Sequence, residues 1–295
     1  MSSLVGISEA VSELVRRVEP SVVSVESRRG CSVSGVVWAK DLVLSAAHAI
    51  ERDEKIQVVT SGGQRVEAER VGVFPAADLA VLRLRSELLP FEARRGAALE
   101  LGEVVLALGR VGSRLRVKLG IVSFIGGQWR IGQGVRVEQY IESDIAPSPA
   151  FSAGPLVRAN GELIGLNSAR LARGALVTLP SSTVGGLVDA LVTRGRVVRA
   201  EVGVAVHPVA LPAPLAQKLE RASGLIVMSV RPESPAERAG VMLGDVLLSL
   251  ADSPLTSVEE LENALGEASI GRSQALVLVR AGERLELRIE PREKT

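Results

Sequence analysis

The feature that most constrains the fold is a long run of short apolar segments separated by turn residues. A first set of these segments covers residues 22–25, 35–38, 42–45, 56–59, 66–73 and 79–84. A second set covers residues 102–108, 120–123, 135–141, 154–157, 163–166 and 174–179. Short strands at turn-bounded intervals are typical of a sandwich or a barrel. The two sets therefore predict a mainly β region made of two small barrels, at about residues 21–100 and 101–180.

Composition and length limit the kind of core, the number of domains and the classes of partner. Only 2% of the 295 residues are aromatic, so the cores must be built from Val, Leu, Ile and Ala. The length predicts two domains or three small ones. A formal net charge of +1 gives no electrostatic reason to expect nucleic acid or an anionic membrane as a partner. Cys31 is the single cysteine, which excludes an intrachain disulfide, and we expect it to be a small, partly buried strand residue.

The segments that flank the β region read as helices and a linker. Charged residues are spaced among the apolar residues of 1–20, which predicts an amphipathic N-terminal helix capped at Ser8 rather than a secretory signal. No apolar run is long enough to span a bilayer. The compartment stays open between the cytoplasm and an export route whose signal is missing from this sequence. After the strands, Ser181 or Ser182 is expected to cap a helix that closes the domain at residue 192, and 193–198 reads as a linker.

Residues 199–292 have the pattern of a separate α+β module. Strands are expected at residues 201–204, 224–230 and 246–250. Ser234 is followed by Pro235 and starts a short helix as its N-cap. Ser257 and Glu260 have the spacing of a capping box at the start of a second helix. A closing hairpin is expected at 275–289, with Ala281 and Gly282 in its turn.

Three polar residues of the β region stand in the order His48, Asp78, Ser152, which is the order of chymotrypsin-like proteases. Ser152 precedes Gly154 and Pro155, a stiff turn that can expose a hydroxyl and aim backbone N–H groups at a nearby oxygen. Acyl transfer needs both features. Taken singly, a turn serine, a packed histidine and a strand-bounding aspartate are ordinary, so the prediction of a hydrolase depends on the order of the three.

On these residues the chain resembles the HtrA/Deg family of serine proteases, from about residue 18 to residue 289. The stretches 35–48, 78–82 and 143–157 are similar to those that hold the family's histidine, aspartate and nucleophilic serine, and 234–250 is similar to part of a PDZ domain. The resemblance implies a chymotrypsin-like double β-barrel protease domain followed by an α+β PDZ domain.

The resemblance also implies a mechanism. Ser152 is expected to be the nucleophile, His48 the general base, and Asp78 the residue that orients the imidazole. The backbone N–H groups of Ala150 and Ser152 are expected to form the oxyanion hole. The activity implied is ATP-independent cleavage of unfolded or damaged proteins, as in protein quality control under stress.

Two binding regions follow from the same resemblance. The pocket for the substrate side chain before the cleaved bond is expected to be lined by uncharged residues, which favours small or medium apolar side chains: Pro147, Ser148, Asn167, Ser168 and Ala169. The PDZ module is expected to bind peptide C-termini by adding a strand to its sheet edge. The residues assigned to this groove are Glu201, Val202, Gly203, Val204, Leu261 and Leu265.

Three positions depart from the family pattern. The family has glycine where this chain has Ala150 and Ala153, and alanine tolerates a positive φ poorly. Where Glu201 stands, an apolar residue is usual. Two alternatives therefore stay open: a catalytically weak or inactive relative that serves as a PDZ-containing chaperone, scaffold or inhibitor, and a sensor protease that peptide binding at the PDZ module activates.

The remaining expectations concern cofactors and partners. With two histidines and one cysteine, the sequence shows no metal-ligand spacing, and it has no glycine-rich phosphate loop, so no cofactor is expected. Family members assemble as trimers, often through aromatic N-terminal residues. This chain has no aromatic residue before Trp38, so a homotrimer is an open expectation.

Overall fold

The computed structural model describes residues 3–27, 32–50, 55–91, 98–131, 135–197, 200–266 and 269–293. Cys31 lies outside these residues, so its predicted place on a strand is not described. The chain divides into two compact units, Met1–Val197 and Val198–Thr295, each with its own core. Among the described residues, no helix combines the length and apolar character that crossing a membrane requires.

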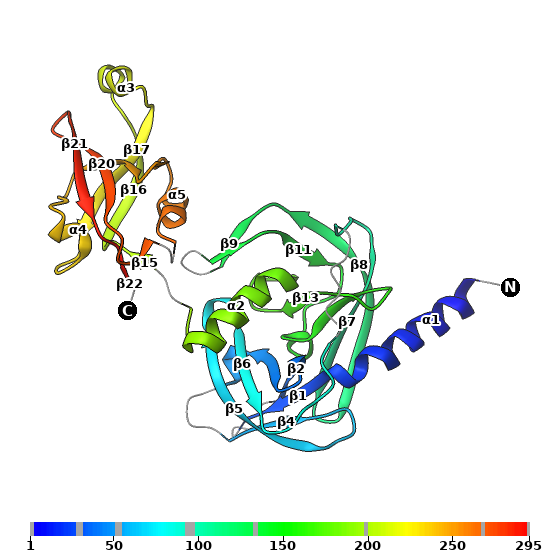
Figure 1. Cartoon of the computed structure of the whole chain (residues 1–295). Coiled ribbons are helices and arrows are strands. Elements are labelled where there is room, and N and C mark those ends of the chain that lie inside the picture. Colours follow the sequence, from blue (N-terminus) through cyan, green and yellow to red (C-terminus); the bar gives the residue numbers. More distant parts are fainter. Residues whose placement is uncertain are drawn as a thin grey trace. The chain divides into compact units, whose positions relative to one another are not determined.

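The first unit contains two closed six-stranded barrels (Figure 1). The first barrel has the strand order β1-β2-β3-β6-β5-β4, with β1 Val22–Glu26, β2 Ser32–Ala39, β3 Leu42–Ala46, β4 Ile56–Val59, β5 Arg65–Phe74 and β6 Leu79–Leu84. The second has the order β11-β14-β13-β12-β7-β8, with β7 Val104–Val111, β8 Arg114–Gly126, β11 Tyr140–Ser143, β12 Pro155–Arg158, β13 Leu163–Ser168 and β14 Leu176–Pro180. A separate hairpin pairs β9 Trp129–Ile131 with β10 Val135–Val137. The mainly β class and the chymotrypsin-like double barrel are confirmed.

Small aliphatic side chains fill both barrels, as the low aromatic content requires. Val23, Val37 and Leu82 are completely buried in the first barrel, and Val105 and Leu156 are completely buried in the second. Closure of each sheet leaves no free strand edge. The polar residues of interest therefore lie at the strand ends and on the connections between strands.

The described residues of this unit include two α-helices. Helix α1, Ser3–Val18, starts before Ser8, so the predicted cap at Ser8 is wrong. The apolar residues of α1 recur at intervals of three and four from Leu4 onward, so the helical pattern already begins before Ser8. Leu14 and Val18 are buried against the barrels, whereas Leu4 and Ile7 are 81% and 53% exposed. In Figure 1, α1 leads away from the barrels toward the N-terminus.

Helix α2, Ser181–Arg194, follows the last strand directly and contacts β5 and β6 of the first barrel and β13 and β14 of the second. Its N-cap residue is Pro180, and no side chain caps it, so the predicted cap at Ser181 or Ser182 is wrong. Both serines lie inside the first turn because Pro180 is already the last extended residue. The helix ends at Gly195, which takes a left-handed φ of 70°.

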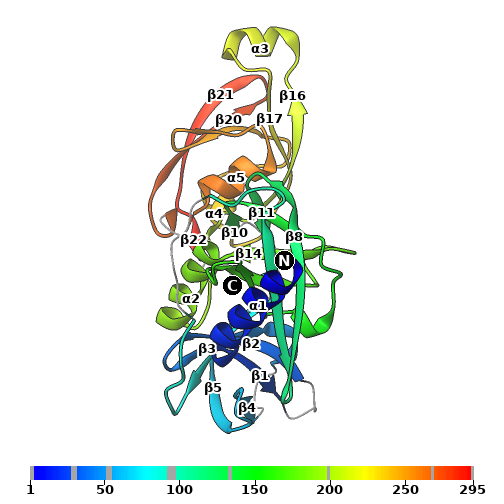
Figure 2. The ribbon, with the colours of Figure 1, turned by 90° about the vertical axis from the view of Figure 1, so that its right-hand side faces the viewer.

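The second unit is built on a sheet with the strand order β16-β17-β18-β20-β21. Its strands are β15 Ala200–Glu201, β16 Val204–Ala210, β17 Ser223–Val230, β18 Val246–Leu250, β19 Ser253–Pro254, β20 Gln274–Arg280, β21 Glu283–Ile289 and β22 Arg292–Glu293. Its helices are α3 Ala213–Leu219, α4 Pro235–Arg238 and α5 Val258–Ala264. Figure 2 shows α3 at the tip of the β16–β17 hairpin.

Three local predictions for this unit are confirmed. The Ser234 hydroxyl accepts the Glu237 N–H at the start of α4. Ser257 and Glu260 form both hydrogen bonds of the capping box of α5. Ala281 and Gly282 both take positive φ values, 50° and 83°, in the turn between β20 and β21, as a tight two-residue hairpin requires.

Candidate active site

His48 and Asp78 are held together at one end of the first barrel. His48 lies in a short 3-10 turn, Ala47–Ala49, directly after β3, and Asp78 lies directly before β6, the neighbour of β3. The His48 Nδ1 atom is 2.9 Å from Asp78 Oδ1 and 2.8 Å from Oδ2. The His48 backbone N–H also donates to Asp78 Oδ1, at 3.0 Å. The carboxylate therefore fixes both the imidazole and the turn that carries it.

The backbone of Asp78 is part of this arrangement. Asp78 has a left-handed φ of 52° at the end of the 3-10 turn Pro75–Ala77, a region that aspartate tolerates better than most residues. Its carbonyl oxygen accepts the Ala47 N–H at 3.0 Å. The Asp78 side chain is 8% exposed and that of His48 is 25% exposed. The carboxylate is thus shielded from water while the ring stays accessible.

Ser152 lies at the end of another 3-10 turn, Pro149–Phe151, directly before Ala153, Gly154 and β12. We call residues 147–154 the nucleophile loop. Ser152 is buried, and its Oγ accepts the Ala169 N–H at 3.3 Å. Ala153 takes a φ of 59° and donates its N–H to the carbonyl of Asn167 at 2.7 Å. At position 153, where the family has glycine, this chain therefore holds an alanine in a strained, left-handed backbone conformation.

The nucleophile loop meets the first barrel close to His48. Ala153 packs in the core cluster of the first barrel together with Ala46, which precedes the His48 turn, and Ala49, which is the last residue of that turn. Ser152 Oγ makes no hydrogen bond to His48 in this arrangement of the described residues. Such contacts are often long before substrate binds.

The two predicted oxyanion donors are hydrogen-bonded inside the loop. The Ser152 N–H donates to the carbonyl of Pro149 at 3.2 Å. The Ala150 N–H donates to Ser148 Oγ at 3.4 Å, a long bond. Ala150 has no positive φ. The Pro149 carbonyl oxygen therefore accepts the Ser152 N–H that was predicted to stabilise the negatively charged oxygen of the reacting substrate carbonyl.

The residues predicted to line the substrate pocket lie on two segments next to this loop. Pro147 is exposed and Ser148 half-buried on the loop, whereas Asn167 and Ser168 are buried on β13 and Ala169 follows them. Asn167 Oδ1 accepts the Thr178 hydroxyl at 2.8 Å, and its buried Nδ2 has no partner among the described residues. An amide donor is thus free at this point of the second barrel.

Comparisons with known proteins match both units. Residues 33–166 match the family model of the trypsin-like peptidase domain, and residues 200–290 match that of the PDZ domain. The solved structure titled HtrA-type protease AlgW with decapeptide has a TM-score of 0.79 and 25% identity, covering 96% of this chain and 98% of that chain. The serine endoprotease from Yersinia pestis has a TM-score of 0.80 and 28% identity, with coverages of 96% and 98%.

Curated relatives agree with the solved structures. The periplasmic serine endoprotease DegP of Escherichia coli K12 is 32% identical over 268 residues, which make up 87% of this chain and 56% of the relative. The chain belongs to the HtrA/Deg family. Another member, the probable periplasmic serine endoprotease DegP-like of Chlamydia trachomatis, is 32% identical over 263 residues, with coverages of 86% and 52%. This HtrA-type chain thus spans about half the length of the curated relatives it matches.

In the PDZ unit of this HtrA-type chain, most of the residues predicted to bind peptide come together. Val202 and Leu261 are buried in the core of the unit, and Val204 and Leu265 pack partly buried against it. Val202 precedes β16 and Val204 begins it, whereas Leu261 lies on α5 and Leu265 is its C-cap residue. Strand β16 and helix α5 contact each other. Strand β16 pairs only with β17 in the described sheet, so its other edge is open beside α5. This is the edge to which a peptide strand could be added.

Glu201 lies outside that apolar group. Its carboxylate is buried and accepts two bonds from Arg231 Nη1, at 2.8 and 2.7 Å, and one from Arg292 Nε, at 3.2 Å. The charge is therefore compensated by two guanidinium groups rather than free to repel a peptide carboxylate. Sequence reasoning missed both arginines because they lie 30 and 91 residues from Glu201.

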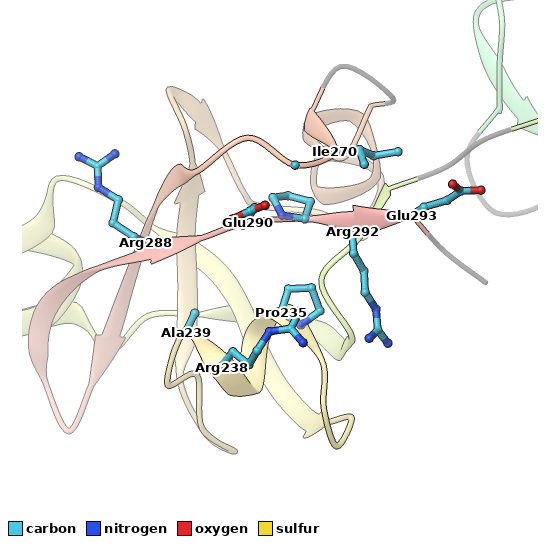
Figure 3. Close-up of a pocket in the computed structure, with 10 residues that line it drawn as sticks. Pro235, Arg238, Ala239, Ile270, Arg288, Glu290, Arg292 and Glu293 are labelled. Atoms are coloured by element: carbon cyan, nitrogen blue, oxygen red, sulfur yellow. The ribbon is translucent and has the colours of Figure 1, made fainter.

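One hollow of the PDZ unit, of about 400 Å³, lies apart from the open edge of β16 (Figure 3). None of the residues predicted to bind peptide lines it. Its walls carry charges of both signs, from Arg238, Arg288, Arg292, Glu290 and Glu293. Two of these arginines already donate to the carbonyl of Glu233, at 3.2 and 3.0 Å. The described part of the chain contains no group of three or more His, Cys, Asp or Glu residues that could hold a metal ion.

Proposed function

We propose that this protein is a serine endopeptidase that cleaves unfolded or damaged proteins without ATP. The observation that carries the proposal is the bond of His48 Nδ1 to both carboxylate oxygens of Asp78, at 2.9 and 2.8 Å. With the proton held on Nδ1, the other ring nitrogen, Nε2, is the basic one. Membership of the HtrA/Deg family and the names of the relatives, which are serine endoproteases, support the same activity.

The catalytic steps follow from these roles. Ser152 Oγ attacks the carbonyl carbon of a peptide bond while its proton passes to His48 Nε2. His48 then donates this proton to the leaving amine as the C–N bond breaks, which leaves an acyl-enzyme on Ser152. A water molecule gives a proton to His48 Nε2 and attacks the acyl carbon. The ester bond to Ser152 then breaks, the product leaves with a free carboxyl group, and His48 returns its proton to Ser152 Oγ. Asp78 stabilises the imidazolium in each step without taking its proton.

The oxyanion hole requires one rearrangement of the nucleophile loop. If the planar peptide unit between Pro149 and Ala150 turns over, its carbonyl oxygen and its N–H exchange sides. The turn frees the Ser152 N–H from the Pro149 carbonyl and brings the Ala150 N–H to the same side. Both predicted donors then face the developing negative charge, where one such donor contributes on the order of 100- to 1000-fold in rate.

For substrate selection we propose two sites. Pro147, Ser148, Asn167, Ser168 and Ala169 form an uncharged pocket that takes small or medium apolar side chains, which become accessible when proteins unfold. The open edge of β16 and the apolar residues of α5 bind a peptide C-terminus. Pro208 on this edge strand lacks an N–H, which limits the length of strand that can pair. Solved relatives titled with a bound decapeptide or tripeptide support a peptide ligand.

The test is active-site labelling. The parent protein, Ser152→Ala and His48→Ala are incubated with a fluorophosphonate probe, and casein cleavage is followed in parallel. Labelling of the parent alone, with slower cleavage in His48→Ala, is the expected result. A parent that stays unlabelled, also after addition of C-terminal peptides, would contradict the endopeptidase and leave the peptide-binding module as the active part.

We also propose self-association as a homotrimer through α1. Its first turns expose Leu4, Val5 and Ile7, at 81%, 69% and 53%, and a monomer gains nothing from this apolar surface. Leu4→Glu combined with Ile7→Glu should reduce the mass measured by light scattering to that of one chain. The relatives' names place them in the periplasm, and cell fractionation would show whether this chain shares that compartment.

A further inference from the structure

A buried serine of the first barrel touches the nucleophile loop of the second. Ser34 lies on β2 and is completely buried. Its Oγ is 2.6 Å from the carbonyl oxygen of Ala150 and accepts the Arg110 N–H of β7 at 2.8 Å. The carbonyl of Arg110 is farther away, at 3.3 Å. Because a hydroxyl has a single proton to donate, the Ser34 proton belongs to the short bond with Ala150.

The loop is packed closely against β7 at this point. A Cβ atom on Gly109 would lie 1.9 Å from the Ala150 carbonyl oxygen and 2.9 Å from Ser34 Oγ. A Cβ atom on Gly154 would lie 2.1 Å from the carbonyl oxygen of Leu108. Only glycine at these two positions lets the loop approach the strand so closely. The Ala150 carbonyl is therefore fixed by a hydrogen bond on one side and by contact with β7 on the other.

The peptide unit that Ser34 holds is the neighbour of the one that must turn. The Ala150 carbonyl belongs to the unit between Ala150 and Phe151, whereas the oxyanion hole needs the unit between Pro149 and Ala150 to turn over. Phe151 is 2% exposed, so packing holds the far side of the same unit. With this unit fixed, the turning Ala150 N–H has one defined end position, beside the Ser152 N–H.

We propose that Ser34 is a positioning residue of the active site: its hydroxyl fixes the Ala150 carbonyl, so that the Ala150 and Ser152 N–H groups point at the same oxygen when the preceding peptide unit turns. The inference rests on the proposed endopeptidase function. Ser34 does not touch the substrate and takes no part in proton transfer. Its loss is expected to slow acylation of Ser152 and to leave substrate binding unchanged.

The chain offers a matched control in Ser24. Ser24 is also completely buried in the first barrel, on β1. Its Oγ accepts a backbone N–H of the second barrel, that of Gly112 at 2.9 Å, and lies 2.7 Å from Ser32 Oγ. Ser24→Ala therefore removes the same hydroxyl from a bridge between the same two barrels, without contact to the nucleophile loop.

The experiment compares the full-length parent, Ser34→Ala and Ser24→Ala in two measurements. The first is the rate of Ser152 acylation by a fluorophosphonate, together with kcat and KM for a peptide substrate. The second is amide hydrogen exchange of the segment 146–157, which needs no activity. For Ser34→Ala we expect acylation and kcat to fall about tenfold or more, KM to stay unchanged, and the segment to exchange faster. Ser24→Ala should match the parent in all of these.

Each other outcome overturns the proposal. Acylation of Ser34→Ala at the rate of Ser24→Ala would show that the hydroxyl does not position the oxyanion hole. Unchanged exchange of segment 146–157 would show that Ser34 does not hold the loop, whatever the rate. A parent that the probe does not label would overturn the endopeptidase function and the catalytic part of the inference together, while the exchange data would still decide whether Ser34 holds the loop.

Discussion

Replacing Ala150 with glycine should speed acylation of Ser152. In the structure the Pro149 carbonyl accepts the Ser152 N–H at 3.2 Å, and the proposed mechanism turns one peptide unit of the loop to form the oxyanion hole. Turning a planar unit rotates ψ of the residue before it and φ of the residue after it by about 180° in opposite senses. Ala150, which starts without a positive φ, therefore ends in the positive region.

The size of the expected rate increase follows from the free-energy cost of a positive φ at residue 150. A positive φ costs an alanine roughly 1–2 kcal/mol, whereas it costs a glycine almost nothing. The hydrogen bond from Ser152 N–H to Pro149 breaks in both proteins and cancels in the comparison. Since about 1.4 kcal/mol corresponds to a factor of ten, Ala150→Gly should raise the acylation rate about 5- to 30-fold. The free energy of unfolding of Ala150→Gly should be lower by about 0.5–1 kcal/mol, because glycine increases the conformational entropy of the unfolded chain.

The assay is the rate of fluorophosphonate labelling at several probe concentrations, with urea unfolding measured alongside. Ala150→Ser keeps a Cβ atom and serves as the control that should show no gain. Ala150→Gly combined with Ser152→Ala should not be labelled at all. If Ala150→Gly reacts no faster than the parent while the parent does react, the turn of this peptide unit does not limit acylation and the argument fails.

Further predictions concern three other places. Gly109→Ala places a Cβ 1.9 Å from a carbonyl oxygen of the nucleophile loop; it should abolish labelling and lower the unfolding free energy by about 1–3 kcal/mol, and normal labelling would contradict the packing described. Burial alone would raise the pKa of the Asp245 carboxyl, but two 2.8 Å bonds from Arg280 and a backbone N–H hold it below its usual value. The stability this gives is present above about pH 4 and lost as pH falls further; Asp245→Asn should cost about 3 kcal/mol in urea unfolding at pH 7 and flatten the acid dependence, and an unchanged acid profile would refute the assignment. Burial, then the hydrogen bond and charge of Glu142, raise the pKa of Tyr140, the single tyrosine, to about 12; its phenolate absorbance should titrate there, and at lower pH in Glu142→Gln.

Local features were the most predictable from sequence. The helix starts at Ser234 and Ser257 came out as expected because a cap depends on residues within one turn of the chain. Ser8 and Ser181 failed as caps for a related reason. The periodicity of α1 starts before Ser8, and β14 runs to Pro180, so both serines lie inside helices. A serine can be the N-cap of a helix only where it directly precedes the first helical residue.

The sequence predicted only some of the residues of the candidate site. His48, Asp78 and Ser152 could be named from the resemblance, and the structure brings the first two into contact across 30 residues. Their catalytic roles stay predictions. Nothing in the sequence pointed to Ser34, because a serine in an apolar strand is ordinary and its partner Ala150 is 116 residues away. The sequence also did not reveal the hydrogen bonds made by the two predicted oxyanion donors, since these bonds depend on the rotation of one peptide unit.

The sequence by itself indicated most of the strand segments and the starts of α4 and α5, since apolar periodicity and caps act over a few residues. It did not predict α3, and the strand expected at 201–204 is divided between the end of β15 and the start of β16. Only the tertiary structure decided which ends of these segments meet. Barrel closure sets Asp78 beside His48 and the Ser34 hydroxyl beside the nucleophile loop, and the fold of the second unit compensates Glu201 with two distant arginines. Contacts of this kind are fixed by strand order and register, which depend on the packing of the whole unit.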